Sequence, residues 1–320
     1  MLGNKTIVVT GASSGAGKAI ALEFALQKPT LILAARNPDA LREVAAECSE
    51  LGAQVKYVIT DVTDASAMIE LAAEAKAFGG KIDIWVNNAG LLAVGSFDEV
   101  PLAVHQKVID TNLMGYINGA HAVLPYFKLQ KHGVLINNIS IGGFLPVPFG
   151  VGYSASKFGL RGFSAALKAE LADWPNIHIC DAFPAFLDTP GIQHAANYTG
   201  KYLKPAPPVY DPRRVAISIV KLAEKPRAEV MIGSVSTLLR SSYGLFPALT
   251  RGITAAVIRT YLKNADPIAK SDGNVFGPVD YGNAVYGGWG IPGKPKAHRK
   301  YLIAGLLLAT AAGLLSLRRK

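Results

Sequence analysis

Cysteine and charge are both scarce in this chain. Two of its 320 residues are cysteine, and only 18% are Asp, Glu, Lys or Arg. Cys48 falls in a helical pattern and Cys180 closes an apolar strand, so no disulfide framework is predicted and both thiols are expected to be buried and inert. No apolar signal segment precedes the first strand-like run, so we expect the globular part in the reducing cytosol.

Patterns for binding metal or nucleic acid are missing as well. The formal charge of +10 is concentrated at one end, because residues 291–320 contain seven Lys or Arg and no acid. No basic face with interleaved aromatic residues is found elsewhere, which argues against nucleic-acid binding. None of the internal histidines lies at metal-ligand spacing from another histidine or from a cysteine, so no metal site is predicted. These histidines are His105, His121, His132, His178 and His194.

Strand-like and helix-like segments alternate, which predicts a parallel α/β fold. The first unit is a β-branched run at residues 7–9, a glycine-rich turn at residues 10–17 and a helix at residues 18–26. Glycines let the backbone approach a ligand closely, and free N–H groups at a helix start attract phosphate. Further strands are expected at residues 31–33, 55–59, 82–86, 134–139, 177–183 and 229–232, with helices at 39–51, 64–78 and 101–128 and around 153–157. The pattern predicts a Rossmann-like doubly wound parallel sheet of about seven strands, with helices on both faces and ligands at the carboxyl ends of the strands.

Tyr153 and Lys157 are the candidate proton-transfer pair. Four residues apart on a helix, they lie on one face, and the ammonium of Lys157 is expected to favour the ionised phenol. A free phenol with a pKa of about 10 is a poor base at neutral pH, so a neighbouring positive charge would bring it into a useful range. Ser140 ends the strand at residues 134–139, and its hydroxyl is expected to reach the same substrate oxygen. Such a pair also occurs by chance on solvated helices, so other segments must support it.

Those other segments resemble the short-chain dehydrogenase/reductase family over residues 3–235. The motifs Thr10-Gly11-x-x-x-Gly15-x-Gly17, Asn87-Asn88-Ala89-Gly90, Asn112, Ser140 and Tyr153-x-x-x-Lys157 stand in that family's order and spacing. The resemblance implies hydride transfer between a nicotinamide cofactor and a carbonyl or secondary alcohol, with Tyr153 as the general acid/base. It also implies that Asn112 holds a water in the proton relay, that Lys157 binds ribose hydroxyls, and that residues 87–90 stabilise the central strand and flank the cofactor.

The resemblance assigns site residues position by position. The catalytic residues are Asn112, Ser140, Tyr153 and Lys157. The cofactor-binding residues are Thr10, Gly11, Ser13, Ser14, Gly15, Ala16, Gly17, Arg36, Asp61, Val62, Asn88, Ala89, Gly90, Tyr153, Lys157, Pro184 and Thr189. The chain departs from the family pattern at Ala16, where a larger aliphatic residue is common, and at Ala185, where a glycine is expected between Pro184 and Thr189. Neither change removes a reacting group.

The end of the second strand predicts the choice of cofactor. An acidic side chain there would accept hydrogen bonds from the adenosine ribose and repel a 2′-phosphate, whereas a basic side chain can pair with that phosphate. Ala35 occupies the position of the acid in NAD-preferring relatives, and Arg36 follows it. Ser14 stands at the family's other basic position and contributes no charge. We therefore expect NADP(H) rather than NAD(H), selected mainly by Arg36, with Asp61 contacting the adenine.

The composition divides the chain into four regions. They are a Rossmann-type NADP-binding catalytic domain at residues 1–234, an amphipathic helical extension at 235–263, an extended linker at 264–298 and a membrane-anchor helix at 299–320. Residues 191–211 are loop-like, where the family places its substrate lid. The amphipathic extension suits either a membrane surface or an ordinary helix pair packed on the domain. Residues 301–317 carry no charge, so a single C-terminal membrane anchor is expected, with the catalytic domain in the cytoplasm.

These features predict a membrane-attached, NADP(H)-dependent oxidoreductase for a small lipophilic carbonyl or alcohol, with a homodimer or homotetramer as its assembly. One alternative is a catalytically silent nucleotide-binding sensor or scaffold at a membrane, but such a protein has no reason to keep Tyr153 and Lys157 together. Another is a sugar-nucleotide epimerase or dehydratase, which would carry a Thr-Gly-x-x-Gly-x-x-Gly turn. The turn at residues 10–17 has the other spacing.

Overall fold

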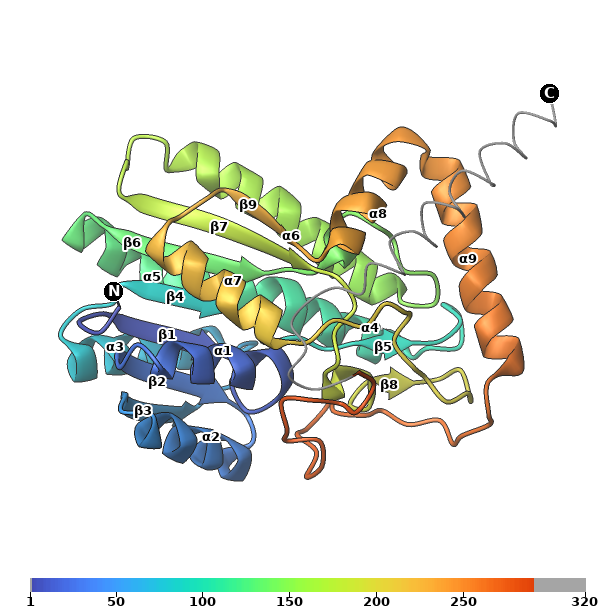
Figure 1. Ribbon diagram of the computed structural model, residues 1–320, viewed down its shortest axis with the longest axis horizontal. Helices are drawn as coiled ribbons and strands as arrows, with labels where there is room; N and C mark the ends of the chain where they lie inside the picture. The colour runs from blue at the N-terminus through green and yellow to red at the C-terminus, as the bar shows by residue number, and fades with distance from the viewer. Residues whose placement is uncertain (1, 291–320) are drawn as a thin grey trace.

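A seven-stranded parallel sheet forms the centre of the computed structural model, which describes residues 2–290 (Figure 1). The strand order is β3-β2-β1-β4-β6-β7-β9, so the order reverses between β1 and β4. These strands are β1 (Thr6–Thr10), β2 (Thr30–Ala35), β3 (Gln54–Ile59), β4 (Ile84–Asn87), β6 (Gly133–Asn138), β7 (Ile177–Pro184) and β9 (Glu229–Ile232). A separate two-stranded sheet pairs β5 (Ala93–Val94) with β8 (Ala196–Asn197). The predicted doubly wound sheet is confirmed.

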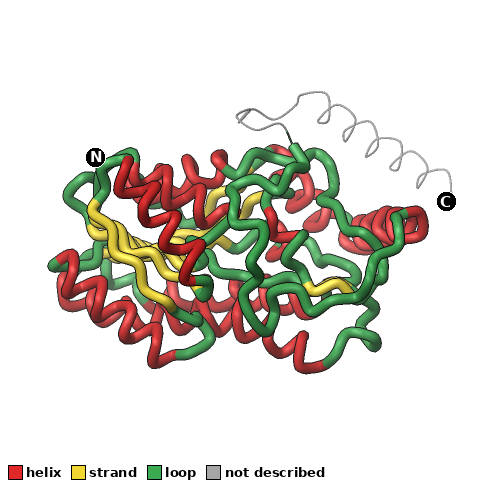
Figure 2. Tube along the Cα trace, turned by 90° about the horizontal axis from the view of Figure 1, so that it is seen from below, coloured by secondary structure: helices red, strands yellow, loops and turns green. Residues whose placement is uncertain are grey.

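Helices cover both faces of the sheet (Figure 2). The helices are α1 (Gly15–Ala25), α2 (Pro38–Glu50), α3 (Ala65–Gly79), α4 (Leu102–Ile109), α5 (Gly115–Gln130), α6 (Val151–Glu170), α7 (Arg213–Glu224), α8 (Ser234–Leu245) and α9 (Pro247–Asn264). Capping side chains explain where two helices start. Asn37 caps α2 through the Ala40 N–H, and Asp64 caps α3 through the N–H groups of Ser66 and Ala67. The single helix expected at residues 101–128 is interrupted by a π-helical turn at Asp110–Met114.

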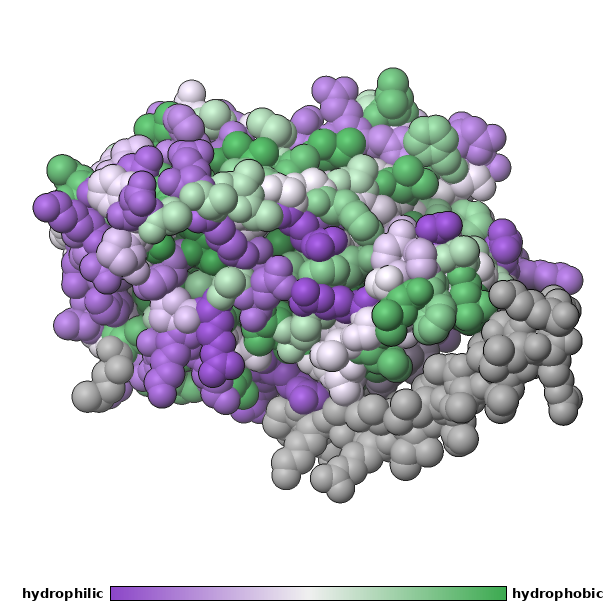
Figure 3. Space-filling model, turned by 90° about the horizontal axis from the view of Figure 1, so that it is seen from above, coloured by the Kyte–Doolittle hydropathy of each residue, from purple (hydrophilic) through white to green (hydrophobic). Residues whose placement is uncertain are grey.

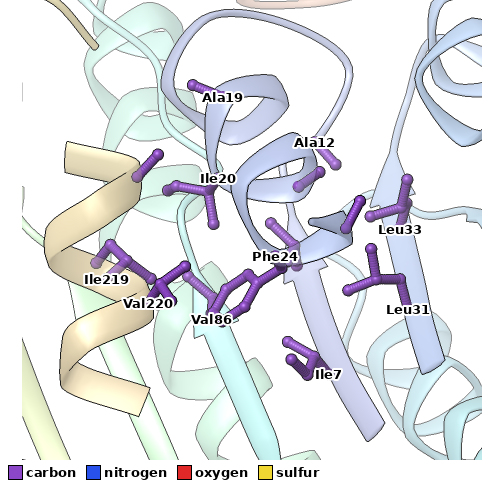
Figure 4. Close-up of a cluster of buried hydrophobic side chains, with 14 of the residues drawn as sticks. Ile7, Ala12, Ala19, Ile20, Phe24, Leu31, Leu33, Val86, Ile219 and Val220 are labelled. Atoms are coloured by element: carbon purple, nitrogen blue, oxygen red, sulfur yellow. The ribbon is translucent and has the colours of Figure 1, made fainter. Parts of the chain in front are cut away.

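The core has two layers because successive residues of a strand point to opposite faces. Ile7 and Val9 of β1 face a layer formed with α1, α2 and α7, whereas Val8 faces a layer formed with α3, α5 and α6. In the first layer Phe24 of α1 lies between the strands and Ile219 of α7 (Figure 4). Burial of apolar surface contributes about 25 cal/mol per Å², so these two layers supply the main stabilisation of the sheet.

Both cysteines lie inside this core. Cys48 of α2 and Cys180 of β7 are buried free thiols, as the sequence predicted. Burial raises the pKa of Cys48 to about 12 and that of Cys180 to about 11. Thiolates are the reactive form of cysteine, so both side chains are inert at neutral pH.

The region after the sheet differs from the expected arrangement. Helices α8 and α9 form the expected helical extension, but residues 265–290 do not form an extended linker. They return from the end of α9 to the carboxyl edge of the sheet, beside β8 and α1 (Figure 1). The anchor expected at residues 299–320 lies outside the described residues. Across residues 2–290, none of the helices has the length and hydrophobicity required to cross a bilayer.

Candidate active site

The glycine-rich turn joins β1 to α1 at the carboxyl edge of the sheet. Gly11 and Gly15 have φ values of +64° and +53°, in the left-handed region that favours glycine. A side chain at Gly17 would overlap the carbonyl oxygen of Gly11, so α1 starts in direct contact with the end of β1. Within the described residues, the N–H groups of Ala16 and Gly17 donate to no acceptor. The start of α1 therefore offers two free donors to an anion.

Residues 87–90 connect the ends of the central strands. The Nδ2 of Asn88 donates to the carbonyl oxygens of Thr10 and Gly11 at 3.1 Å and 3.2 Å, and its Oδ1 accepts from Asn138 at 2.9 Å. Asn87 donates to Asn137 on the neighbouring strand at 3.0 Å. The amides thereby fix the edge of β4 against its neighbours β1 and β6.

Asn112 lies in the π-helical turn between α4 and α5. Its Oδ1 accepts from the Leu91 N–H at 2.6 Å, and its Nδ2 donates to the Leu91 carbonyl at 2.8 Å and to Ser156 Oγ at 3.2 Å. The side chain is fully buried and its amide is engaged on both atoms. It therefore holds the loop after residues 87–90 against α6, the helix that carries Tyr153 and Lys157. Turns of this type occur often at functional sites.

Ser140 and Tyr153 lie together beside Gly142. A side chain placed on Gly142 would lie 2.8 Å from Cε1 of Tyr153 and 3.6 Å from Oγ of Ser140. Ser140 has φ +102°, a backbone conformation that costs a non-glycine residue about 1–3 kcal/mol. Its Oγ accepts from the Gly142 N–H at 3.2 Å. The structure thus brings the two hydroxyl-bearing residues together at the amino end of α6.

Lys157 is buried one turn further along the same face of α6. Its Nζ lies 5.0 Å from the ring centre of Tyr116 and 5.7 Å from that of Tyr153. Among the described residues, no acceptor receives a hydrogen bond from this ammonium, and burial lowers its pKa to about 7. A buried ammonium without a protein acceptor fits a ligand that offers hydroxyl or carbonyl oxygens.

Burial, rather than Lys157, has the largest effect on the pKa of the Tyr153 phenol. Burial raises the pKa of the Tyr153 phenol above its ordinary value, and its hydrogen bond with Ser140 only partly offsets that effect. Lys157 is not among the groups that lower the pKa of this phenol, and burial lowers the pKa of the Lys157 ammonium itself to about 7. The spacing of the pair was predictable, whereas the degree of burial was not.

Arg36 and Asp61 lie at the same edge of the sheet, after β2 and β3. Burial would raise the pKa of Asp61, but hydrogen bonds from Thr63 together with Lys107 and Arg36 hold it below its ordinary value. The Nη2 of Arg36 donates to the carbonyl oxygen of Asn274 at 2.7 Å. Arg36 therefore sits beside a carboxylate and retains further N–H donors for a ligand.

The other residues predicted for the site line the same edge. Thr189 lies against the glycine turn, since a side chain on Gly15 would come within 3.3 Å of its Cβ. Val62 packs against Gly115 at the start of α5. Pro184 ends β7, and Ala185 follows with its N–H on the Ile232 carbonyl at 3.0 Å. Ser13 and Ser14 belong to the turn itself, with Ser14 as the N-cap of α1.

Sequence reasoning missed the contact of residues 272–290 with this edge. The Ala284 carbonyl accepts from the Gly15 N–H at 2.9 Å, and Asp188 accepts from three backbone N–H groups of residues 287–290. The glycines of this segment were interpreted as a sign of an extended linker. Glycine is, however, also the residue required where one backbone packs closely against another. No local pattern distinguishes the two uses.

The doubly wound sheet, the glycine turn at its first helix and the Tyr-Lys pair at its carboxyl edge define a nicotinamide-dependent α/β oxidoreductase. Residues 5–198 match the family described as short chain dehydrogenase. The chain belongs to the short-chain dehydrogenase family, as the order of its motifs predicted. It is an enzyme of the type that acts on CH–OH or C=O groups with a nicotinamide cofactor.

Relatives and solved structures agree with this assignment. An uncharacterised oxidoreductase of Bacillus subtilis, YxnA, is 32% identical over 254 residues, which cover 78% of this chain and 71% of that protein. The 3-ketodihydrosphingosine reductase of Bos taurus is 29% identical over 283 residues, covering 82% and 85% of the two chains. An alcohol dehydrogenase from Thermococcus sibiricus, solved with 5-hydroxy-NADP, superposes with a TM-score of 0.63 at 28% identity, over 72% of this chain and 97% of that one.

Proposed function

We propose that the protein is an NADP(H)-dependent oxidoreductase in which Tyr153 exchanges a proton with the oxygen of a carbonyl or secondary alcohol. The observation that carries the proposal is the meeting of Ser140, Tyr153 and Lys157 at the carboxyl edge of the sheet, beside the turn that starts α1. When bound, the nicotinamide supplies or accepts the hydride. The chain supplies the proton and the positions of the groups.

The residues present fit such a cofactor. The free N–H groups of Ala16 and Gly17 would bind the pyrophosphate, and Lys157 would donate to ribose hydroxyls. Arg36, next to Ala35, provides a guanidinium for a 2′-phosphate at a position without a competing acid. The dehydrogenase from Thermococcus sibiricus, solved with 5-hydroxy-NADP, supports this choice.

The proton-transfer roles follow from the contacts. Ser140 Oγ and the Tyr153 hydroxyl would hold the substrate oxygen, and the phenol would give or take the proton. Ligand hydroxyls around Lys157 would restore its full charge, which lowers the pKa of the neighbouring phenol. The amide of Asn112 is occupied by Leu91 and Ser156, so a water held here would rest on the backbone of the π-helical turn.

The decisive experiment is an enzyme assay on a panel of ketones, aldehydes and secondary alcohols. The purified protein should oxidise NADPH with a carbonyl substrate or reduce NADP with an alcohol, and Tyr153→Phe should abolish the signal. Ser154→Ala is the matched control, since the Ser154 hydroxyl bonds only to Val147 backbone on the other side of the helix start. Failure of the wild type across the panel would refute the proposal.

A lipophilic substrate and membrane attachment belong to the same proposal. The bovine relative is named as a reductase of 3-ketodihydrosphingosine, which favours a lipid-like carbonyl compound here. Residues 301–317 are uncharged and basic residues flank them. Residues 234–264 carry Arg240, Arg251, Arg259 and Lys263 but no acid. This composition suits an anionic membrane surface.

The apolar side chains of α8 and α9 add to that argument. Leu245, Phe246 and Val257 are 73%, 61% and 58% exposed, and in α9 only Thr250 is buried. Hydrophobic side chains gather at the end of the molecule that carries these helices (Figure 3). We place the end of the catalytic domain at residue 234, so that α8 and α9 with their exposed apolar side chains follow it.

Sedimentation with lipid vesicles separates the two attachment elements. Deleting residues 300–320 should release the protein from neutral vesicles, whereas Phe246→Ser with Val257→Ser should weaken binding to anionic vesicles by about tenfold or more. Exposed Leu129, which lies on α5, provides the control Leu129→Ser. Unchanged vesicle binding of both variants would contradict membrane attachment by these segments. Loss of a dimer in the double variant would instead show that the apolar face of α8 and α9 packs against a second copy of the chain.

A further inference from the structure

Residues 272–290, here called the strap, cross the carboxyl edge of the sheet along the proposed cofactor site. At one end the strap is held by Arg36, which donates to the Asn274 carbonyl at 2.7 Å, and by Asn37, which donates to the Val279 carbonyl at 3.2 Å. In the middle the Ala284 carbonyl accepts from the Gly15 N–H at 2.9 Å. The strap thus touches the residues proposed for the 2′-phosphate and the turn proposed for the pyrophosphate.

Asp188 holds the other end of the strap. Its Oδ1 accepts from the N–H groups of Gly287 at 3.1 Å and Trp289 at 2.7 Å, and its Oδ2 accepts from that of Gly290 at 2.9 Å. The carboxylate is only 2% exposed. Hydrogen bonds to a charged acceptor are about twice as strong as neutral ones, and three of them at one buried carboxylate make this cluster a firm attachment of the strap to the domain.

Glycines of the strap are required by close backbone contact. A side chain on Gly287 would overlap the Thr189 carbonyl, and one on Gly273 would overlap the His194 carbonyl. Gly277 is different, because a side chain there would meet open space and its φ is not positive. The segment is therefore shaped to dock at defined points, and one of them is the loop that carries Thr189.

We propose that the strap is the outer wall of the dinucleotide-binding site and that Asp188 is a positioning residue that holds the strap in place. This inference rests on the proposed function, since it assumes a dinucleotide bound along the glycine turn, on the side that the strap faces. The strap takes the Gly15 N–H and one donor of Arg36, whereas the N–H groups of Ala16 and Gly17 stay free for phosphate. Strap and cofactor use different donors, so both can be bound at once, and the cofactor leaves only when the strap detaches from Asp188.

The attachment between Asp188 and the strap, here called the latch, can be weakened by a substitution on either side. In Gly287→Ala the new methyl group collides with the Thr189 backbone, and in Asp188→Asn the amide turns an N–H donor toward other donors. Gly277→Ala is the matched control on the same segment. Hydrogen exchange of the peptide 281–290 in the cofactor-free protein reports latch opening, and stopped-flow fluorescence reports the rate at which NADPH dissociates.

In both latch variants we expect faster hydrogen exchange of that peptide and at least a tenfold faster release of NADPH. In Gly277→Ala we expect both rates to equal those of the wild type. A roughly tenfold change is what the loss of one hydrogen bond to a charged group produces. The single-turnover rate of hydride transfer should stay within about threefold, because the catalytic groups are untouched.

Three results would overturn the inference. Tighter NADPH binding in the latch variants would mean that the strap competes with the cofactor. An unchanged release rate, in variants whose peptide exchanges faster, would mean that the strap does not wall the dinucleotide-binding site. Unchanged exchange in both variants would mean that Asp188 is not the latch. Absence of NADPH binding by the wild type is a separate result, which refutes the proposed function and the wall together.

Discussion

The affinity for NADPH should fall as the pH rises above 7, and Lys157 is the reason. Burial lowers the pKa of its ammonium to about 7 in the ligand-free protein. The ribose hydroxyls of a bound cofactor would accept hydrogen bonds from the protonated form and so raise that pKa in the complex. Binding above pH 7 therefore requires uptake of a proton from solution.

The magnitude follows from the pKa alone. While the bound form stays protonated, the apparent Kd is multiplied by 1 + 10^(pH − 7), which is about 2 at pH 7 and about 100 at pH 9. The Kd should thus increase about 50-fold across these two pH units. Before the cofactor binds, neither tyrosine beside Lys157 titrates in this range, because burial raises the pKa of both Tyr116 and Tyr153 above their ordinary values.

Fluorescence titration with NADPH at constant ionic strength, between pH 7 and 9, measures the effect. A phosphate with a second pKa near 6 is already about nine-tenths ionised at pH 7, so the 2′-phosphate contributes almost no slope. Calorimetry in two buffers of different ionisation enthalpy should show uptake of about one proton at pH 8.5. Lys157→Met should bind weakly and with no pH dependence. A flat curve for the wild type, or the same slope in Lys157→Met, would refute the reasoning.

Three further results are expected. Tyr153→Phe should lower kcat by about 10²- to 10⁴-fold while the Kd for NADPH, measured by titration, changes little, and wild-type turnover would remove Tyr153 from the mechanism. Ala35→Asp with Arg36→Ala should reverse the ratio of kcat/KM for NADPH and NADH, and equal use of both cofactors by the wild type would contradict the role of Arg36. Asp181→Ala should lower the free energy of unfolding by about 3 kcal/mol in urea denaturation, because the buried carboxylate accepts from Ser164, Asn137 and Lys168. The exposed ion pair of Arg42 provides the control, and Arg42→Ala should change stability by less than about 1 kcal/mol.

The doubly wound sheet, and the location of the candidate site residues at the carboxyl ends of its strands, could be predicted because both depend on local patterns. Apolar runs separated by helices define the strands, and the carboxyl ends of those strands bring Asn88, Ser140 and Thr189 to one edge. The pair Tyr153 and Lys157 needed only the periodicity of a helix. Each of these inferences uses residues close together in the sequence or at the ends of predicted strands.

What could not be predicted depends on tertiary contact. The π-helical turn around Asn112 has no composition of its own, since it is fixed by the bonds of that amide to Leu91 and Ser156. The strap has the composition of a linker, yet its docking depends on Asp188 and on the Thr189 backbone, which lie about a hundred positions earlier. The pKa of Lys157 depends on desolvation, which spacing does not report.

The two buried cysteines make the protein convenient for spectroscopy. With pKa values of about 12 and about 11, Cys48 and Cys180 have almost no thiolate at neutral pH and no access to a maleimide in the folded protein. One cysteine introduced on the exposed side of the strap, for example Phe276→Cys, would then be the only site of labelling. A second cysteine, introduced at exposed Leu26 at the far end of α1, would give a pair of labels for a distance measurement. The two native cysteines would not need to be removed first.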